Sequence, residues 1–331
     1  MVIFLKVLMM NKHYFLKVFV SSLVGIFSTL NFAVAQTDYP NKPITLVVGF
    51  SPGSSIDLVA RTYAKSITNK LKVPVIVENK AGAGGNIAAE WVAKSKADGY
   101  TFLVVANSIA ISPASYTNPN FDVKKDLVAI AYMGIGPLIL KVNKDLKINS
   151  VKELVNYAKD HPGKLNYGSS GEGGTPHMAT ILFEQTANIK MTHIPYKGGG
   201  EALAALMGGQ VDLLINPLLG DIKSERISSL AITGSSRSPL SPDIPTFKES
   251  GYDFNIGVYY GIMGPKGIPV KLVDTMNQIF NDSLSDTELI DILTNKSGIV
   301  TQKMSPNEFQ EYLNKDIELW KKVVAKTKAG G

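Results

Sequence analysis

The apolar stretch ITLVVGF at residues 44–50 is followed directly by the small polar stretch SPGSSID at residues 51–57. The first stretch has the length and composition of a buried strand, and the second resembles a capping box that starts a helix at Ser54. Leu58, Ala64 and Ile67 then recur at helical spacing. A strand that passes through a short loop into a helix is the repeating unit of an α/β fold.

The same alternation of strand and helix continues along the chain. It predicts strands at residues 75–77, 101–106, 138–142, 165–167, 192–194, 211–215 and 230–233. Between them it predicts helices at residues 87–97, 150–159, 176–187 and 201–207, the second opened by a capping box at Ser150. The last third predicts a strand at residues 256–263 and helices at 269–284 and 305–324, with a capping box at Ser305.

The pattern restarts in the middle of the chain, which predicts two α/β units. We expect these units to be joined near residues 134–137 and again near the Ser- and Pro-rich residues 235–239, with the C-terminal third returning to the first unit. Lobe 1 then comprises residues 36–136 and 238–331, and lobe 2 comprises residues 137–237. A double crossing of this kind is expected of a hinged clamshell with its ligand in the cleft between the lobes.

The first 35 residues have the pattern of a secretory signal peptide. Lys6, Lys12 and Lys17 precede a charge-free run at residues 18–32, and an A-x-A signal ends at Ala35. We expect cleavage after Ala35 and a protein that works in the periplasm. An uncleaved anchor is the alternative, although the apolar run is short for a bilayer span. Met10 is an alternative to Met1 as the start of translation.

Composition excludes several classes of protein. Three of the lysines behind the formal charge of +6 lie in the signal segment, and the remaining basic residues are scattered. Nucleic acid binding would need a basic stripe, so none is expected. The chain has no cysteine, which excludes disulfides, thiol nucleophiles and a lipoprotein anchor.

Three loops rich in Gly and Ser lie where predicted strands lead into helices, at residues 50–57, 79–86 and 168–175. Such loops direct backbone amides toward an anion at a helix N-terminus, and in open α/β sheets they meet at the carboxyl ends of the strands. The sequence therefore predicts an anion site. Nucleotide motifs are incomplete, because Ile87 stands where a dinucleotide fingerprint needs its third glycine.

Other chemistry has weak support in the sequence. The histidines after the signal, His161, His177 and His193, lack metal-ligand spacing, so we expect neither a metal nor a cofactor. A secreted hydrolase that uses Ser169 or Ser170 with His177 stays open as an alternative. We otherwise expect no catalytic residues and no enzymatic activity.

Many short motifs, in order, resemble the Bug-type solute receptors of tripartite tricarboxylate transporters. They are YPNKPITLVV at residues 39–48, FSPG at 50–53, VENKAGAGG at 77–85, ADGYT at 97–101, YGSSG at 167–171, PYKG at 195–198, GGQVD at 208–212 and PDIPT at 242–246. The resemblance implies a two-lobed periplasmic binding protein, a type II-like clamshell with parallel-rich sheets flanked by helices. It also implies a monomer that binds a small carboxylate and docks on integral membrane permease subunits.

The resemblance implies which residues hold the ligand carboxylate. Carried over to this chain they are Ser51, Gly53, Ser54, Ser55, Ala106, Asn107, Ser108, Ser169, Ser170 and Gly171. The family's first loop commonly has a second Gly where Ser54 stands here. Amino acids, di- and tricarboxylates and aromatic acids all fit such donors, and a sensory receptor of the same fold is a further alternative.

Overall fold

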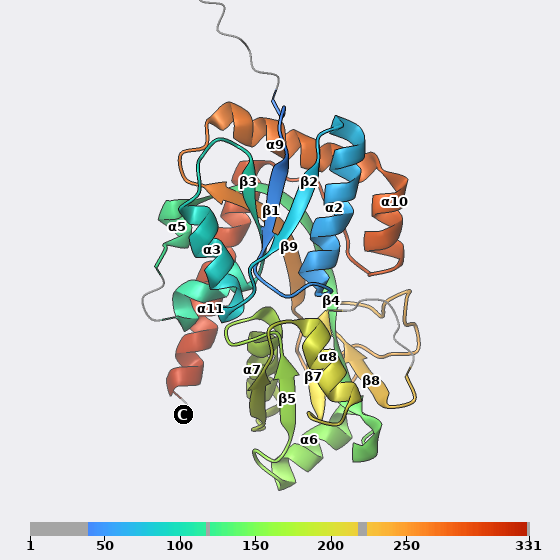
Figure 1. The fold of residues 1–331 in the computed structure, drawn as a ribbon. Helices are drawn as coiled ribbons and strands as arrows, with labels where there is room; N and C mark the ends of the chain where they lie inside the picture. The colour runs from blue at the N-terminus through green and yellow to red at the C-terminus, as the bar shows by residue number, and fades with distance from the viewer. Residues whose placement is uncertain (1–38, 117–119, 218–223, 330–331) are drawn as a thin grey trace, which may run out of the picture. The chain divides into compact units, whose positions relative to one another are not determined.

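The computed structural model describes residues 39–116, 120–217 and 224–329, so the predicted signal peptide lies outside the described residues. The chain divides into two units between Asn41 and Lys42, and the fold concerns the second unit (Figure 1). None of the helices formed by the described residues combines the length and the apolar character that crossing a bilayer requires.

Within this unit the described strands form one mixed sheet. Its order is β2-β1-β3-β9-β4-β7-β5-β6, and β8 also pairs with β4. The strands are β1 (Ile44–Val48), β2 (Val75–Asn79), β3 (Thr101–Ala106), β4 (Leu127–Asn143), β5 (Asn166–Ser169), β6 (Thr192–Pro195), β7 (Leu213–Pro217), β8 (Ile227–Ile232) and β9 (Gly257–Pro265). Strand β1 runs parallel to β2 and β3, and β5 runs parallel to β6 and β7, as the βαβ pattern predicts.

Helices flank the sheet, as the sequence predicts. They are α2 (Ser55–Leu71), α3 (Asn86–Ala93), α4 (Ser108–Ser115), α5 (Val123–Asp126), α6 (Val151–Asp160), α7 (Thr175–Ala187), α8 (Gly199–Met207), α9 (Val270–Asp282), α10 (Thr287–Ile290) and α11 (Pro306–Ala329). Two predicted capping boxes are confirmed, since Ser150 Oγ accepts from Glu153 N at 3.1 Å and Ser305 Oγ accepts from Glu308 N at 3.2 Å. The short helices α4, α5 and α10 were not predicted, because a turn or two carries too little apolar periodicity.

One long strand, β4, crosses the middle of the sheet (Figure 1). Its first part pairs with β9 from Leu127 to Pro137, and its last part pairs with β7 and β8. The sequence predicted only the last part, because glycine and proline at residues 134–137 look like strand breakers. A shift in register between Tyr132 and Gly134 lets the strand continue through them. The junction that we expected between lobe 1 and lobe 2, near residues 134–137, therefore lies inside a continuous strand.

Helix α11 covers β4 and β9 through an aromatic cluster. Phe309 is fully buried, and its ring lies 5.9 Å from that of Tyr132 and 6.3 Å from that of Tyr259. Gly261 in β9 leaves the room that Phe309 fills, because a Cβ at this position would overlap the Phe309 ring and lie 3.1 Å from the carbonyl oxygen of Ala131.

We expect Gly261→Ala to lower the free energy of unfolding by about 1–3 kcal/mol, because an added methyl group must displace a packed ring. Urea unfolding followed by circular dichroism measures this change. Phe309→Leu should recover part of the loss in the Gly261→Ala background, although it destabilises the unsubstituted protein. Equal stability of Gly261→Ala and the unsubstituted protein would contradict this account of the packing.

Candidate functional site

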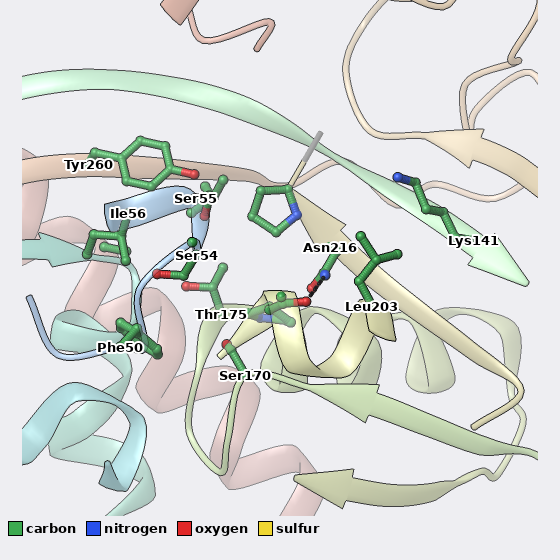
Figure 2. A pocket seen from close by; sticks show the side chains of 17 residues that line it. Phe50, Ser54, Ser55, Ile56, Lys141, Ser170, Thr175, Leu203, Asn216 and Tyr260 are labelled. Atoms are coloured by element: carbon green, nitrogen blue, oxygen red, sulfur yellow. Dashed lines mark hydrogen bonds between the residues drawn. The ribbon is translucent and has the colours of Figure 1, made fainter. Parts of the chain in front are cut away.

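A cavity of about 220 Å³ lies between the two halves of the sheet (Figure 2). At about 30 Å³ for each water molecule, it has room for about seven waters or one small organic acid. The residues that line it are Phe50, Gly53, Ser54, Ser55, Ile56, Ala106, Lys141, Ser170, Thr175, Pro176, Gly199, Gly200, Leu203, Asn216, Pro217, Val258 and Tyr260.

Three helices begin at this cavity. Helix α2 begins at Ser55, α7 at Thr175 and α8 at Gly199, and all three residues line the cavity. The first amides of a helix have no intrahelical acceptor, and none of these three helices has a side-chain cap. Since the helix dipole adds positive potential at each start, the cavity is suited to an anion.

The Ser54 side chain differs from its predicted role. The sequence predicted a capping box, but the Ser54 hydroxyl makes no cap and has no hydrogen-bond partner among the described residues. It is only 4% exposed and lines the cavity. The predicted capping box is wrong in its second contact too, because the Asp57 carboxylate accepts from the amide of Gly53 at 3.0 Å, while the amide of Ser54 donates to Ser51 O at 3.3 Å. The Ser54 hydroxyl is therefore available to a ligand.

Asp57 holds the first loop in place. Its carboxylate accepts hydrogen bonds from Gly53 N, from Arg61 Nε at 2.9 Å and from Asn79 Nδ2 at 2.8 Å. Burial raises the pKa of Asp57, but the hydrogen bonds from Arg61, Asn79 and Gly53 together lower it below its usual value. The carboxylate is therefore charged at neutral pH, and the structural role that we expected for Asp57 and Arg61 fits these contacts.

Two stacked histidine rings support the third loop from behind. The rings of His177 and His193 lie 3.9 Å apart with an angle of 12° between their planes. The amide of Gly173 donates to His177 Nδ1 at 3.1 Å, and Ser169 Oγ is hydrogen-bonded with His193 Nε2 at 2.6 Å. Ser169 is fully buried and pairs with His193 rather than with His177, so this arrangement does not support the hydrolase alternative.

In the described part of the chain, one group of side chains has its donor atoms close enough for a metal ion. It consists of Glu172, His177 and His193, whose donor atoms lie within 4.8 Å of one another. Nδ1 of His177 and Nε2 of His193 already make hydrogen bonds, and stacked rings direct their lone pairs side by side rather than toward one point. We therefore assign these histidines to the support of the loop.

The second Gly-rich loop does not line the cavity. It packs on the third loop instead, where a Cβ at Gly84 would lie 2.6 Å from the carbonyl oxygen of Glu172. The hydroxyl of Tyr116 donates to the same oxygen at 2.7 Å. The first and third loops therefore line the cavity, while the second loop packs on the third.

The structure separates the predicted site residues into two groups. Those that line the cavity are Gly53, Ser54, Ser55, Ala106 and Ser170, and those that do not are Ser51, Asn107, Ser108, Ser169 and Gly171. The Asn107 side chain donates to Gly257 O at 3.3 Å and accepts from Tyr259 N at 3.1 Å, so it fixes β9. The amide of Ser51 donates to Lys197 O at 3.4 Å.

The sequence analysis missed several lining residues. Gly199 and Gly200 follow the same pattern of small residues before a helix as the first and third loops, and this signal could have found them. Lys141 interrupts the apolar run LILKV at residues 138–142, and Asn216 interrupts LLINP at 213–217. A lone polar residue in an apolar strand indicates a candidate site residue. Only the fold, however, brings Lys141 and Asn216 to the same cavity.

The histidine pair makes stability depend on pH. Burial, together with the neighbouring His177, lowers the pKa of His193 to about 4. In the unfolded chain the pKa of histidine is about 6.5. Between these values the unfolded chain binds a proton that the folded protein does not, so the free energy of unfolding falls as pH drops from about 6.5 to about 4.

We expect His193→Gln to reduce the loss of the free energy of unfolding that occurs as pH drops from about 6.5 to about 4. Urea unfolding at a series of pH values measures the difference between the variant and the unsubstituted protein. Glu184→Gln is the control of opposite sign, because burial raises the pKa of Glu184 to about 7 and its contribution is lost as pH rises from about 4.5 to about 7. Parallel pH profiles for His193→Gln and the unsubstituted protein would show that His193 is not held neutral.

Comparisons with known proteins agree with this geometry. The family described as "Tripartite tricarboxylate transporter family receptor", TctC, matches residues 59–328. The protein BugT of Bordetella pertussis is 33% identical over 317 residues, which cover 93% of this chain and 97% of BugT.

Two solved structures have closely similar folds. The structure of the periplasmic binding protein BugD has a TM-score of 0.82 and 31% identity, and the match covers 87% of this chain and 98% of BugD. The structure of R. palustris Rpa4515 with adipate has a TM-score of 0.83 and 30% identity, with the same coverage of 87% and 98%. The predicted α/β fold of a two-lobed periplasmic binding protein is confirmed. The chain belongs to the TctC family, the periplasmic solute-binding receptors of tripartite tricarboxylate transporters.

Proposed function

We propose that the protein is a receptor that captures a small carboxylate-bearing solute in the cavity and delivers it to a tripartite permease in the membrane. The observation that carries this proposal is the meeting of three uncapped helix N-termini at one cavity. Amides at helix starts bind carboxylates through hydrogen bonds and through the helix dipole.

The ligand carboxylate binds at the starts of α2 and α7. Hydroxyl groups of Ser54, Ser55, Ser170 and Thr175 line the cavity beside these helix starts (Figure 2). Burial raises the pKa of Tyr260, so its phenol stays neutral, and its hydroxyl has no hydrogen-bond partner among the described residues and can donate to a ligand as well. Neutral donors suit a receptor, because the anion must leave again when the protein meets its permease.

Release follows from the proposed division into lobes. Lobe 1, residues 36–136 and 238–331, contributes the start of α2, and lobe 2, residues 137–237, contributes the starts of α7 and α8. Opening of the lobes removes about half of the ligand contacts at once. The adipate in the structure of Rpa4515 supports a carboxylate as the class of solute. We propose that the receptor acts as a monomer on integral membrane permease subunits.

We expect Ser54→Ala and Ser170→Ala each to weaken carboxylate binding about 3- to 10-fold, the range for loss of one hydrogen bond. Isothermal titration calorimetry of the protein, freed of bound solute, measures this with a panel of linear dicarboxylates and monocarboxylates. Ser285→Ala is the matched control, because its exposed hydroxyl donates to Asp282 O and Ser285 does not line the cavity. If both cavity variants bind like Ser285→Ala, the carboxylate lies elsewhere.

The periplasmic location depends on removal of residues 1–35. We expect intact-mass spectrometry of the protein from a periplasmic extract to give a chain that begins at Gln36, because the A-x-A signal ends at Ala35. Ala35→Leu should block this cleavage and leave the precursor attached to the membrane. A periplasmic protein that keeps residues 1–35 would overturn the assignment.

A further inference from the structure

The second Gly-rich loop contacts the third loop, which lines the cavity. A Cβ at Gly84 would lie 2.6 Å from the carbonyl oxygen of Glu172 and 3.4 Å from the carbonyl carbon of Gly173, so the two backbones touch. Gly84 also has a φ of +62°, a conformation that favours glycine. Any side chain at this position would therefore push the two loops apart.

Tyr116 adds a hydrogen bond to this contact from the end of α4. Its hydroxyl donates to Glu172 O at 2.7 Å, and a Cβ at Gly173 would lie 2.7 Å from Tyr116 Cε2. The amide of Tyr116 donates to Ser112 O at 3.0 Å, which fixes its backbone to α4. Burial and the nearby charge of Glu172 raise the pKa of Tyr116, so the phenol is neutral and donates at neutral pH. Tyr116 therefore holds the backbone of the third loop without lining the cavity.

The contacted segment lies between two groups that we assign to the ligand. Ser170 precedes it and α7 begins at Thr175 after it, and both residues line the cavity. The segment is also tied to α7, because the amide of Gly173 donates to His177 Nδ1 at 3.1 Å. A displacement of Glu172 and Gly173 would therefore move the start of α7, whose amides bind the carboxylate in the proposed function.

The contact joins segments from the two proposed lobes. Gly84 and Tyr116 belong to lobe 1, and the third loop belongs to lobe 2. None of the contacting residues lies in the segments near 134–137 and 235–239 that we expect to join the lobes. Because hinged opening separates residues of opposite lobes away from the joining segments, it would break the hydrogen bond between Tyr116 and Glu172. The contact therefore belongs to the closed arrangement of the lobes.

We propose that Tyr116 and Gly84 are positioning residues, which raise the affinity for the carboxylate by holding the lobes closed over it and do not contact the ligand themselves. This proposal rests on the proposed function, in which the carboxylate binds at the starts of α2 and α7. A ligand at the start of α7 orders the third loop for the contact, and the contact in turn favours the closed state. The coupling is reciprocal, so a contact made only in the closed state adds to the retention of the ligand.

Two substitutions break the contact in different ways. Tyr116→Phe removes one hydrogen bond and keeps the ring, so we expect the dissociation constant to rise about 3- to 10-fold. Gly84→Ala adds a methyl group against Glu172 O, so we expect a rise of at least about tenfold. Isothermal titration calorimetry on the protein freed of bound solute measures both. The probe is whichever acid binds the unsubstituted protein most tightly among the linear dicarboxylates from malonate to suberate and the monocarboxylates of equal chain length.

Small-angle X-ray scattering distinguishes loss of closure from a weaker site. Saturating acid should reduce the radius of gyration of the unsubstituted protein, whereas Gly84→Ala should stay expanded. Ser170→Ala changes the cavity wall, so it should bind more weakly and yet become compact at saturation. In the Gly84→Ala background, Tyr116→Phe should cause no further loss of affinity, because the contact is already broken.

Two variants control for backbone strain and for loss of a hydroxyl. Gly163 has a φ of +74°, similar to that of Gly84, and a Cβ there would have no neighbouring atom among the described residues within 4 Å. Gly163→Ala therefore adds strain without a steric clash and should bind like the unsubstituted protein. Tyr157→Phe removes a hydroxyl from α6, which contributes no described residue to the cavity wall, and should also bind normally.

The outcomes separate this proposal from the proposed function. If Tyr116→Phe and Gly84→Ala bind like the two controls, or if acid leaves the radius of gyration of the unsubstituted protein unchanged, the positioning role is overturned and the proposed function stands. If none of the acids binds the unsubstituted protein, the proposed function fails and this proposal fails with it. Should Gly84→Ala not fold by circular dichroism, Tyr116→Phe decides, because a dissociation constant equal to that of Tyr157→Phe overturns the proposal.

Discussion

The first amides of a helix need acceptors, and the structure brings three uncapped helix starts to one buried cavity. This requirement explains most of the local chemistry of the site. The N-cap residues are Ser54, Gly174 and Gly198; the two glycines have no side chain to cap the helix, and the Ser54 side chain makes no cap. In the proposed function a bound anion accepts hydrogen bonds from these amides, so ligand binding and helix termination would use the same backbone groups.

Polar side chains that do not line the cavity hold the first and third loops in place. Asp57 fixes the first loop from below through Gly53, Arg61 and Asn79. The stacked imidazoles of His177 and His193 fix the third loop through Gly173 and Ser169, and burial keeps both rings neutral by lowering their pKa values. These groups hold the amides in position while the surface that meets the ligand stays neutral, except at Lys141.

The sheet links the two parts of the site through β4. This strand pairs with β9 along its first part and with β7 and β8 along its last part, and it also carries Lys141. A single strand that serves both halves of the sheet couples any movement of one half to the backbone of the other. Gly134 has a φ of +139°, which few residues other than glycine adopt, so the backbone requires a glycine near the point where the two parts of β4 meet.

The sequence by itself determined the α/β class, most helix starts and three small-residue loops, of which two line the cavity. These features depend on local signals: apolar runs for buried strands, capping boxes at Ser150 and Ser305, and small residues where backbone amides must be open. It was wrong about the capping box at Ser54, because Asp57 instead accepts from Gly53 N and from the side chain of Asn79, which lies in β2, far from Asp57 in the sequence. It also could not separate Asn107, which fixes β9, from residues that line the cavity.

Only the tertiary structure decided which residues meet at the cavity. Lys141, Gly199 and Asn216 lie far apart in the chain, and strand pairing between β4 and β7 together with the packing of α8 brings them together. The continuity of β4 through Gly134 and Pro137 likewise depends on its partner β9 and on a shift in register. Local sequence fixes backbone conformation over a few residues, whereas the composition of a site between distant segments depends on register and packing, which no short pattern encodes.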